Sequence, residues 1–180
     1  MTTEIRYQCS LDNIAKYLPW AIIVLMVGTV VTVILGDPSA ASTPGVLAAI
    51  AVPILLIVGV MIPMYVLMPV NVLVNDSAIV IERRKTSSVT IPFSEIISIQ
   101  RIDNMRFAVR TFGNGGMFGY TGKFYKKGIG SMTWYCTQRK NYVLIETING
   151  KKIVITPDNP DGFMKNVEAR YPLLVITPAA

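Results

Sequence analysis

Hydrophobic and polar residues are unevenly distributed along the chain, and two long apolar stretches fill its first part. Residues 17–36 and 46–68 contain no Asp, Glu, Lys or Arg. As helices they would measure about 30 Å and 34 Å, enough to cross the hydrocarbon core of a bilayer. The pattern predicts two transmembrane helices, preceded by the segment 1–16 and joined by the turn-rich residues 37–45.

Basic residues near the helix ends predict the orientation of this hairpin. The link 37–45 holds no Lys or Arg, whereas Arg6, Lys16 and a basic C-terminal part flank the helices. Because positive residues favour the cytoplasmic side, both termini are expected in the cytoplasm. A cleaved signal peptide ending at residues 39–41 is the alternative, but its N-terminal region lacks the positive bias that such peptides need.

Small and helix-breaking residues within the two stretches leave further alternatives. Pro53, Gly59 and Pro63 could mark a kinked helix of a transport pathway. Transport is the weaker interpretation, because neither stretch carries an ionisable residue. Gly28 and Thr32 have a small-xxx-small spacing, which suits packing on the second helix or on another copy of the chain.

After Pro69 the pattern changes to short apolar runs separated by turns, which is typical of strands. The clearest turn signal is Asn149-Gly150, a hairpin sequence. Antiparallel strands are predicted at 70–75, 78–84, 88–91, 96–102, 131–137, 142–148 and 152–156, with a further strand around 105–111. The unit is therefore expected to be mainly β.

A single helix is predicted to follow the strands. Asp158 or Asn159 can cap it, and Pro160 suits its first turn. Pro172 ends it. Such a helix can cover one open face or end of a sheet, so a split barrel with a C-terminal capping α-helix is expected.

Composition removes most catalytic classes. The chain has 180 residues, of which 52% are hydrophobic, and it contains no histidine. Catalytic triads, Cys-His pairs and His-metal sites are therefore excluded. Cys9 and Cys136 are expected to be reduced in the cytosol, and Cys136 is predicted to be a packed thiol rather than a nucleophile, because no base lies near it in sequence. We expect no enzymatic activity, no cofactor and no metal.

Positive charge gathers in the part of the chain from residue 70 onward, with fifteen Lys or Arg against eight Asp or Glu. Nucleic acid is not the expected partner, since the cytoplasmic orientation already requires this charge. The basic clusters are either a solvated face or contacts to anionic lipid or another ligand. The candidate residues are Arg83, Arg84, Lys85, Lys123, Lys126, Lys127, Arg139 and Lys140.

Seven of the thirteen glycines fall between Gly113 and Gly130. A phosphate-binding P-loop does not fit, because Gly122-Lys123 is followed by Phe124. A dinucleotide-binding loop fails as well, since its third glycine is missing. Glycines that alternate with aromatic residues predict a long, partly ordered excursion whose rings fold onto the barrel or onto lipid.

The order of elements, together with five short sequences, resembles the bacterial pleckstrin-homology-like (PH) domain family. These sequences are RTFGNGGMFGY at 110–120, WYCT at 134–137, VLI at 143–145, IVITP at 153–157 and NP at 159–160 with Phe163. The similarity covers residues 70–171 and leaves 172–180 as a tail. Its most specific residues are Arg110, Gly113, Gly115, Gly116, Phe118, Gly119 and Tyr120.

The resemblance is closest to members in which two membrane helices precede the domain. It implies a PH-like barrel without a catalysed reaction. Together with the orientation that the charges predict, we expect an anchor in the inner membrane of a bacterium with 37–45 in the periplasm. Eukaryotic relatives often bind phosphoinositides through basic residues in the loop that joins the first two strands. In this chain that loop is Asn75-Asp76-Ser77, which is acidic.

These observations predict a two-helix transmembrane hairpin followed by a mainly-β PH-like split barrel of seven strands with a C-terminal capping α-helix. The expected function is a non-enzymatic binding or assembly module that works through protein contacts or self-association, with the helices in contact with membrane lipids. One alternative is a receptor for a lipid headgroup or small molecule that uses the basic loops. The other is a subunit of an oligomeric transporter or channel.

Overall fold

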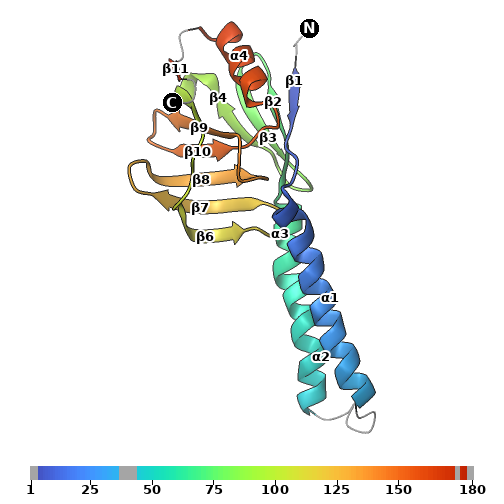
Figure 1. Ribbon diagram of the computed structural model, residues 1–180. Helices are drawn as coiled ribbons and strands as arrows, with labels where there is room; N and C mark the ends of the chain where they lie inside the picture. The colour runs from blue at the N-terminus through green and yellow to red at the C-terminus, as the bar shows by residue number, and fades with distance from the viewer. Residues whose placement is uncertain (1–3, 37–43, 173–174, 178–180) are drawn as a thin grey trace.

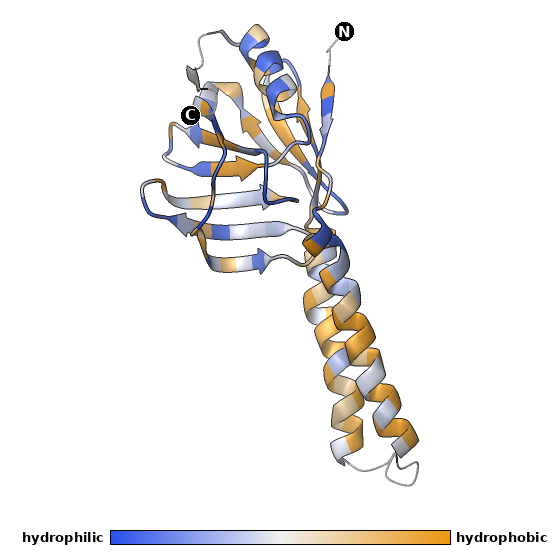
Figure 2. Cartoon of the chain, in the orientation of Figure 1, coloured by the Kyte–Doolittle hydropathy of each residue, from blue (hydrophilic) through white to orange (hydrophobic). Residues whose placement is uncertain are grey.

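The computed structural model describes residues 4–36, 44–172 and 175–177 (Figure 1). Within them, two helices are long and apolar enough to cross a membrane. The first is α1 (Asn13–Gly36), and the second consists of α2 (Pro44–Leu56), η2 (Ile57–Met61) and α3 (Ile62–Val66). Figure 2 shows that both are mostly hydrophobic and project from one side of a mixed, β-rich domain. Most of the expected link, including residues 39–41, lies outside the described residues.

The second helix contains one wider turn near its centre. Residues 57–61 form a π-helical turn, in which the N–H of Ile62 donates to the carbonyl of Ile57. In a regular α-helix the ring of Pro63 would collide with the carbonyl of Gly59, four residues earlier. The π turn gives the ring room, so the helix continues through Pro63 without a break.

The described residues of the domain form two sheets. The smaller has the order β1-β2-β3-β4, and the larger has the order β11-β5-β9-β10-β8-β7-β6. The strands of the smaller sheet are β1 (Ile5–Gln8), β2 (Pro69–Val74), β3 (Ala78–Arg83) and β4 (Val89–Pro92). Those of the larger are β5 (Ile96–Ile102), β6 (Val109–Gly115), β7 (Tyr120–Lys126), β8 (Gly130–Cys136), β9 (Tyr142–Thr147), β10 (Lys152–Ile155) and β11 (Val175–Thr177).

The predicted fold class is confirmed: two apolar helices precede a mainly-β region that is followed by a C-terminal helix. This helix, α4 (Pro160–Arg170), begins as expected, because the Oδ1 atom of Asn159 accepts a 2.9 Å hydrogen bond from the N–H of Gly162. The turn at Asn149-Gly150 also joins two strands, β9 and β10. Gly150 adopts a positive φ of 69° there.

The prediction that all strands are antiparallel is wrong at two pairings. β10 is parallel to β8, and β11 is parallel to β5. The hairpin of β9 and β10 inserts β10 between β8 and β9, so β8 and β10 run in the same direction. β11 forms one edge of the larger sheet, beside β5. It lies within residues 172–180, which were expected to be a tail.

Two further expectations are wrong in part: the strand around 105–111 and the partly ordered, glycine-rich excursion. The strand begins only at Val109, because Asn104 forms a turn in which its Oδ1 atom accepts from the N–H of Arg106. The glycine-rich residues form an ordered antiparallel hairpin of β6 and β7. Gly113 and Gly122 face each other in this pair, where a Cβ atom on either would lie 2.3 Å from a carbonyl oxygen of the other strand.

The larger sheet carries a hydrophobic core on each face. Ile99 and Ile145 lie in the core that is shared with the smaller sheet and with Phe163 of α4. On the opposite face, Trp134 stacks on Phe124 with ring centroids 4.1 Å apart. This second core includes Ala15 of α1, so the first helix begins inside the domain. 

Candidate functional site

The junction between the two helices and the domain contains several polar contacts. Residues 9–12 join β1 to α1, and residues 67 and 68 join α3 to β2. Both short connections are hydrogen-bonded to the domain backbone: Cys9 N–H donates to Val70 (3.0 Å), and Arg84 N–H donates to Met68 (3.0 Å). The helices therefore enter the domain through ordered backbone.

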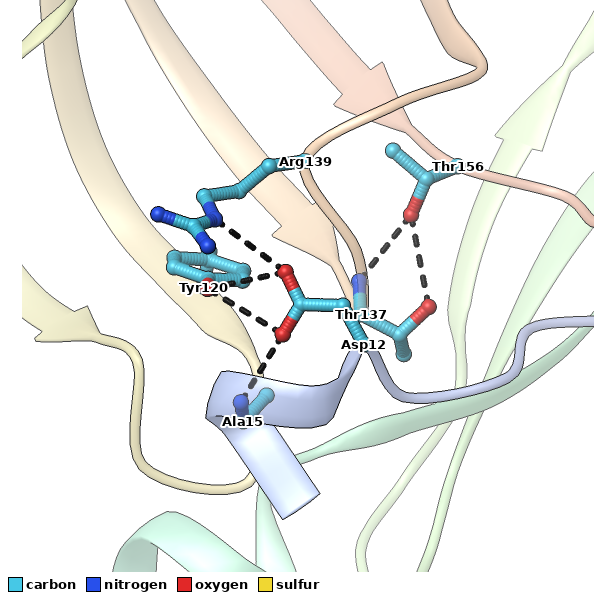
Figure 3. A network of polar contacts seen from close by, with 6 residues as sticks. All are labelled: Asp12, Ala15, Tyr120, Thr137, Arg139 and Thr156. Carbon is cyan, nitrogen blue, oxygen red and sulfur yellow. Dashed lines mark hydrogen bonds and ion pairs between the residues drawn. The ribbon is translucent and has the colours of Figure 1, made fainter. Parts of the chain in front are cut away.

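Asp12 connects the start of α1 to the larger sheet (Figure 3). Its carboxylate accepts hydrogen bonds from the Ala15 N–H at 2.8 Å, the Tyr120 hydroxyl at 3.0 Å and the Arg139 Nε at 3.2 Å. Its own N–H donates to the carbonyl of Thr137 at 3.1 Å. Asp12 is thus both the N-cap of the first helix and an ionic anchor to the domain.

The electrostatics of this network favour a neutral tyrosine. Burial first, and then the adjacent negative charge of Asp12, raise the pKa of Tyr120 to about 12. Only 17% of the Asp12 side chain is exposed. A buried carboxylate needs paired donors, and Arg139 and Tyr120 supply them.

The second helix is held by an aromatic contact on the same side of the domain. The hydroxyl of Tyr65 accepts a 3.0 Å hydrogen bond from Arg84, whose guanidinium also lies 4.6 Å from the centre of the tyrosine ring. Phe118 meets this ring edge-on, at a centroid distance of 5.1 Å. The Phe118 N–H donates to the carbonyl of Ala15 (3.1 Å), so the turn between β6 and β7 contacts both helices.

The residues of the glycine-aromatic motif share this hairpin. Tyr120 and Phe118 make the contacts described above. Gly116 lies beside Ile14 and Leu18 of the first helix, within 4 Å of where its Cβ atom would be. The hairpin therefore brings the motif against the start of α1, which its sequence alone does not reveal.

The eight basic candidates are not brought into one cluster. Arg84 and Arg139 belong to the junction, whereas Arg83 donates to the carbonyl of Ser87. Lys123 donates to the Thr133 hydroxyl at 2.8 Å. Three more, Lys85, Lys127 and Lys140, are exposed, and Lys126 donates to the carbonyl of Asn104. Figure 1 shows the turn between β7 and β8, which holds Lys127, at the end of the sheet away from the helices.

Both thiols lie in hydrophobic cores. Cys9 is 5% exposed and Cys136 is fully buried. Burial raises the pKa of the Cys9 thiol to about 12 and raises that of Cys136 as well. Neither sulfur is a nucleophile in these surroundings. Within the described part of the chain, no three His, Cys, Asp or Glu side chains gather where they could hold a metal ion.

Sequence reasoning missed Asp12 as a site residue. A local signal was present, since Asp precedes the apolar stretch as a helix N-cap would. Its partners Tyr120 and Arg139 could not be identified, because they lie 108 and 127 residues away.

Comparison with known protein families gives a match over more than half of the chain. A family described as "Bacterial PH domain" matches residues 70–171. These residues begin just after α3 and end just beyond α4, so β1 and Asp12 lie before the match. Neither the curated proteins nor the solved structures yielded a match.

Proposed function

Since this chain belongs to the bacterial PH domain family, we propose that it is a non-enzymatic assembly module anchored in the bacterial inner membrane. The two helices span the bilayer, both termini face the cytoplasm, and the module works through self-association or other protein contacts. The positive charge of the domain and the uncharged helices support this orientation. PH domains are typically non-enzymatic binding modules. The sequence contains no histidine, so it lacks the residue on which many catalytic sites depend.

The observation that carries the proposal is the junction itself. Asp12 joins the first helix to Tyr120 and Arg139 through hydrogen bonds, and Tyr65 joins the second helix to Arg84 in the same way. A domain that served only to be retained at a membrane would need no fixed orientation to its anchor. A fixed orientation matters when the arrangement of the helices determines that of the domains, as in an assembly.

The first helix has a surface suited to such an assembly. Gly28, Thr32 and Gly36 recur every four residues and are exposed, whereas Val30 borders the gap to the second helix at Ile54. A Cβ atom at Gly28 would meet nothing within 4 Å. Small residues at this spacing let two helix backbones approach closely in a bilayer.

The loop used by eukaryotic relatives supports protein contacts over a headgroup site. Asp76 forms an ion pair with Arg170 of α4, at 2.7 Å, and its carbonyl accepts from the Tyr171 hydroxyl. Asn75 caps the same turn by accepting from the N–H of Ala78 at 2.7 Å. An acidic turn closed onto α4 is a poor receptor for a phosphate.

Native mass spectrometry of the full-length protein in mild detergent tests this function. We expect a dimer or larger complex, and we expect Gly28→Leu to shift it toward monomer by separating the helix backbones. Ile34→Leu is the matched control, because Ile34 is exposed on the same helix but lies off the small-residue surface and does not border the gap to the second helix. A monomer without any bound protein at every concentration, or equal effects of both substitutions, would contradict the proposal.

A further inference from the structure

A groove of about 440 Å³ separates the second helix from the larger sheet at the junction. Its helix wall consists of Gly59, Val60, Pro63, Met64 and Leu67. Its opposite wall comes from β6, β7 and β8, and Arg83 of β3 also borders it. The aromatic ring of Phe112, which is 78% exposed, lies at this wall.

Three glycines line the groove. Gly113 and Gly122 face each other on the sheet wall, where close backbone contact excludes a Cβ atom. Gly59 lies opposite, in the π turn, and a Cβ atom there would meet nothing within 4 Å. The space at Gly59 is therefore open, and a side chain introduced there would enter it.

The two walls differ in polarity. The helix wall is apolar, whereas the sheet wall presents Thr121 and Thr133. Lys123 reaches this wall, since its ammonium donates to the Thr133 hydroxyl at 2.8 Å. Among the described residues that line the groove, none is acidic, and Arg83 adds a second positive charge. Such a surface suits a ligand with an apolar chain and an anionic head.

The location of the groove selects the source of that ligand. Residues 59–66 belong to the end of a helix that spans the bilayer in our proposed function, so the groove opens at the level where acyl chains meet headgroups. A soluble anion would leave the apolar wall without a partner. An anionic phospholipid matches both walls at once.

We propose that this groove binds one anionic phospholipid of the surrounding bilayer, with an acyl chain against the second helix and the phosphate near Arg83 and Lys123. The site rests on the membrane anchoring proposed above but not on self-association. It is also separate from the loop at Asn75, which is acidic.

The test is lipid binding by full-length protein that has been washed free of lipid in detergent. Phosphatidylglycerol and phosphatidylcholine are added in turn, and native mass spectrometry counts the lipids bound per chain. We expect one tightly retained phosphatidylglycerol molecule per chain and weaker binding of phosphatidylcholine. No retained lipid would overturn the proposal, and so would binding of glycerophosphate alone with equal affinity.

Substitutions that fill the groove distinguish binding at this site from general adhesion of lipid to the protein. Gly59→Phe should weaken phosphatidylglycerol binding about tenfold or more, because displacing only two methylene groups has that effect. Val58→Phe is the matched control, since Val58 is 55% exposed and does not line the groove. Thr133→Leu fills the groove from the sheet wall and replaces the first variant if that variant does not fold. Equal binding by filled and control variants would overturn the site.

The basic residues supply a second readout. Arg83→Gln and Lys123→Gln should each lower the preference for phosphatidylglycerol over phosphatidylcholine about fivefold. Lys127→Gln, at the distant end of the sheet, should leave the preference unchanged. An equal effect of all three would indicate a diffuse surface charge and overturn the site. Because lipids are counted per chain, a protein that proves monomeric can still pass this test.

Discussion

The hydroxyl of Tyr120 donates a 3.0 Å hydrogen bond to the carboxylate of Asp12, across 108 residues of sequence. Asp12 begins the first apolar helix, and Tyr120 begins β7 of the larger sheet. The contact therefore connects the first helix to the domain, although the match to the family starts only at residue 70. Residues 5–12, which precede the first helix, are therefore part of the domain.

Replacing Asp12 should lower the stability of the full-length protein. Asp12→Ala removes the N-cap and leaves Tyr120 and Arg139 without their acceptor, which should cost about 2–3 kcal/mol. Asp12→Asn keeps the cap and should cost less. Chemical unfolding in detergent, followed by the fluorescence of buried Trp134, measures both. The control is Asp103→Ala, which breaks a partly exposed ion pair with Arg101 of little expected worth. A larger loss there than in Asp12→Ala would refute the role of Asp12.

Thiol labelling should report whether the N-terminal segment stays docked. Cys9 is buried against β2, and its pKa of about 12 leaves almost no thiolate at neutral pH. A maleimide reagent should therefore label the native protein very slowly and the unfolded protein at once. Asp12→Ala should speed the labelling of Cys9, which lies three residues before the lost anchor. Rapid labelling of native wild-type Cys9 would show that the segment is detached.

Stability should fall at alkaline pH because of Tyr120. Its pKa in the folded protein, about 12, exceeds the ordinary value of 10.0. The folded state thus holds this proton more tightly, so the stabilisation is complete below pH 10 and is lost as the pH rises toward 12. Tyr120→Phe should be less stable than wild type at pH 8 and should lose less stability between pH 10 and 12. Identical pH slopes for the two proteins would contradict the assignment.

Much of the fold could be predicted from local patterns. The two apolar helices, most strands of the domain and the N-cap of α4 at Asn159 each depend on residues close together in sequence. β1 was missed because Ile5–Gln8 has two polar residues in four, and its partner β2 begins at Pro69. No local pattern reveals a pairing across that distance.

The glycine-rich hairpin was missed for another physical reason. Glycine lowers strand propensity, so β6 and β7 appeared irregular. In the structure, Gly113 and Gly122 allow the two backbones to approach where side chains would collide. The composition that argued against a strand is what this pairing requires.

Reporter fusions should establish the topology. Fusions at Ala180 should behave as cytoplasmic and insertions at Ser42 as periplasmic, because the flanks are basic and the link is not. Mass spectrometry of the mature protein should also find residues 17–36 retained, since cleavage near residue 41 would remove β1 and Asp12 from the domain. A periplasmic signal at Ala180, or a mature N-terminus near residue 41, would disprove the proposed anchoring.

The most direct test of the central claim, that helices and domain form one body, is a distance distribution between spin labels in a bilayer. One label replaces Val24 on α1 and the other replaces Lys151 in the turn between β9 and β10, both of which are exposed. The native cysteines are buried, and excess unlabelled protein removes distances between copies. We predict one narrow distance peak for the wild-type background and a broader distribution for Asp12→Ala. A broad distribution in the wild-type background, unchanged by Asp12→Ala, would contradict a fixed junction.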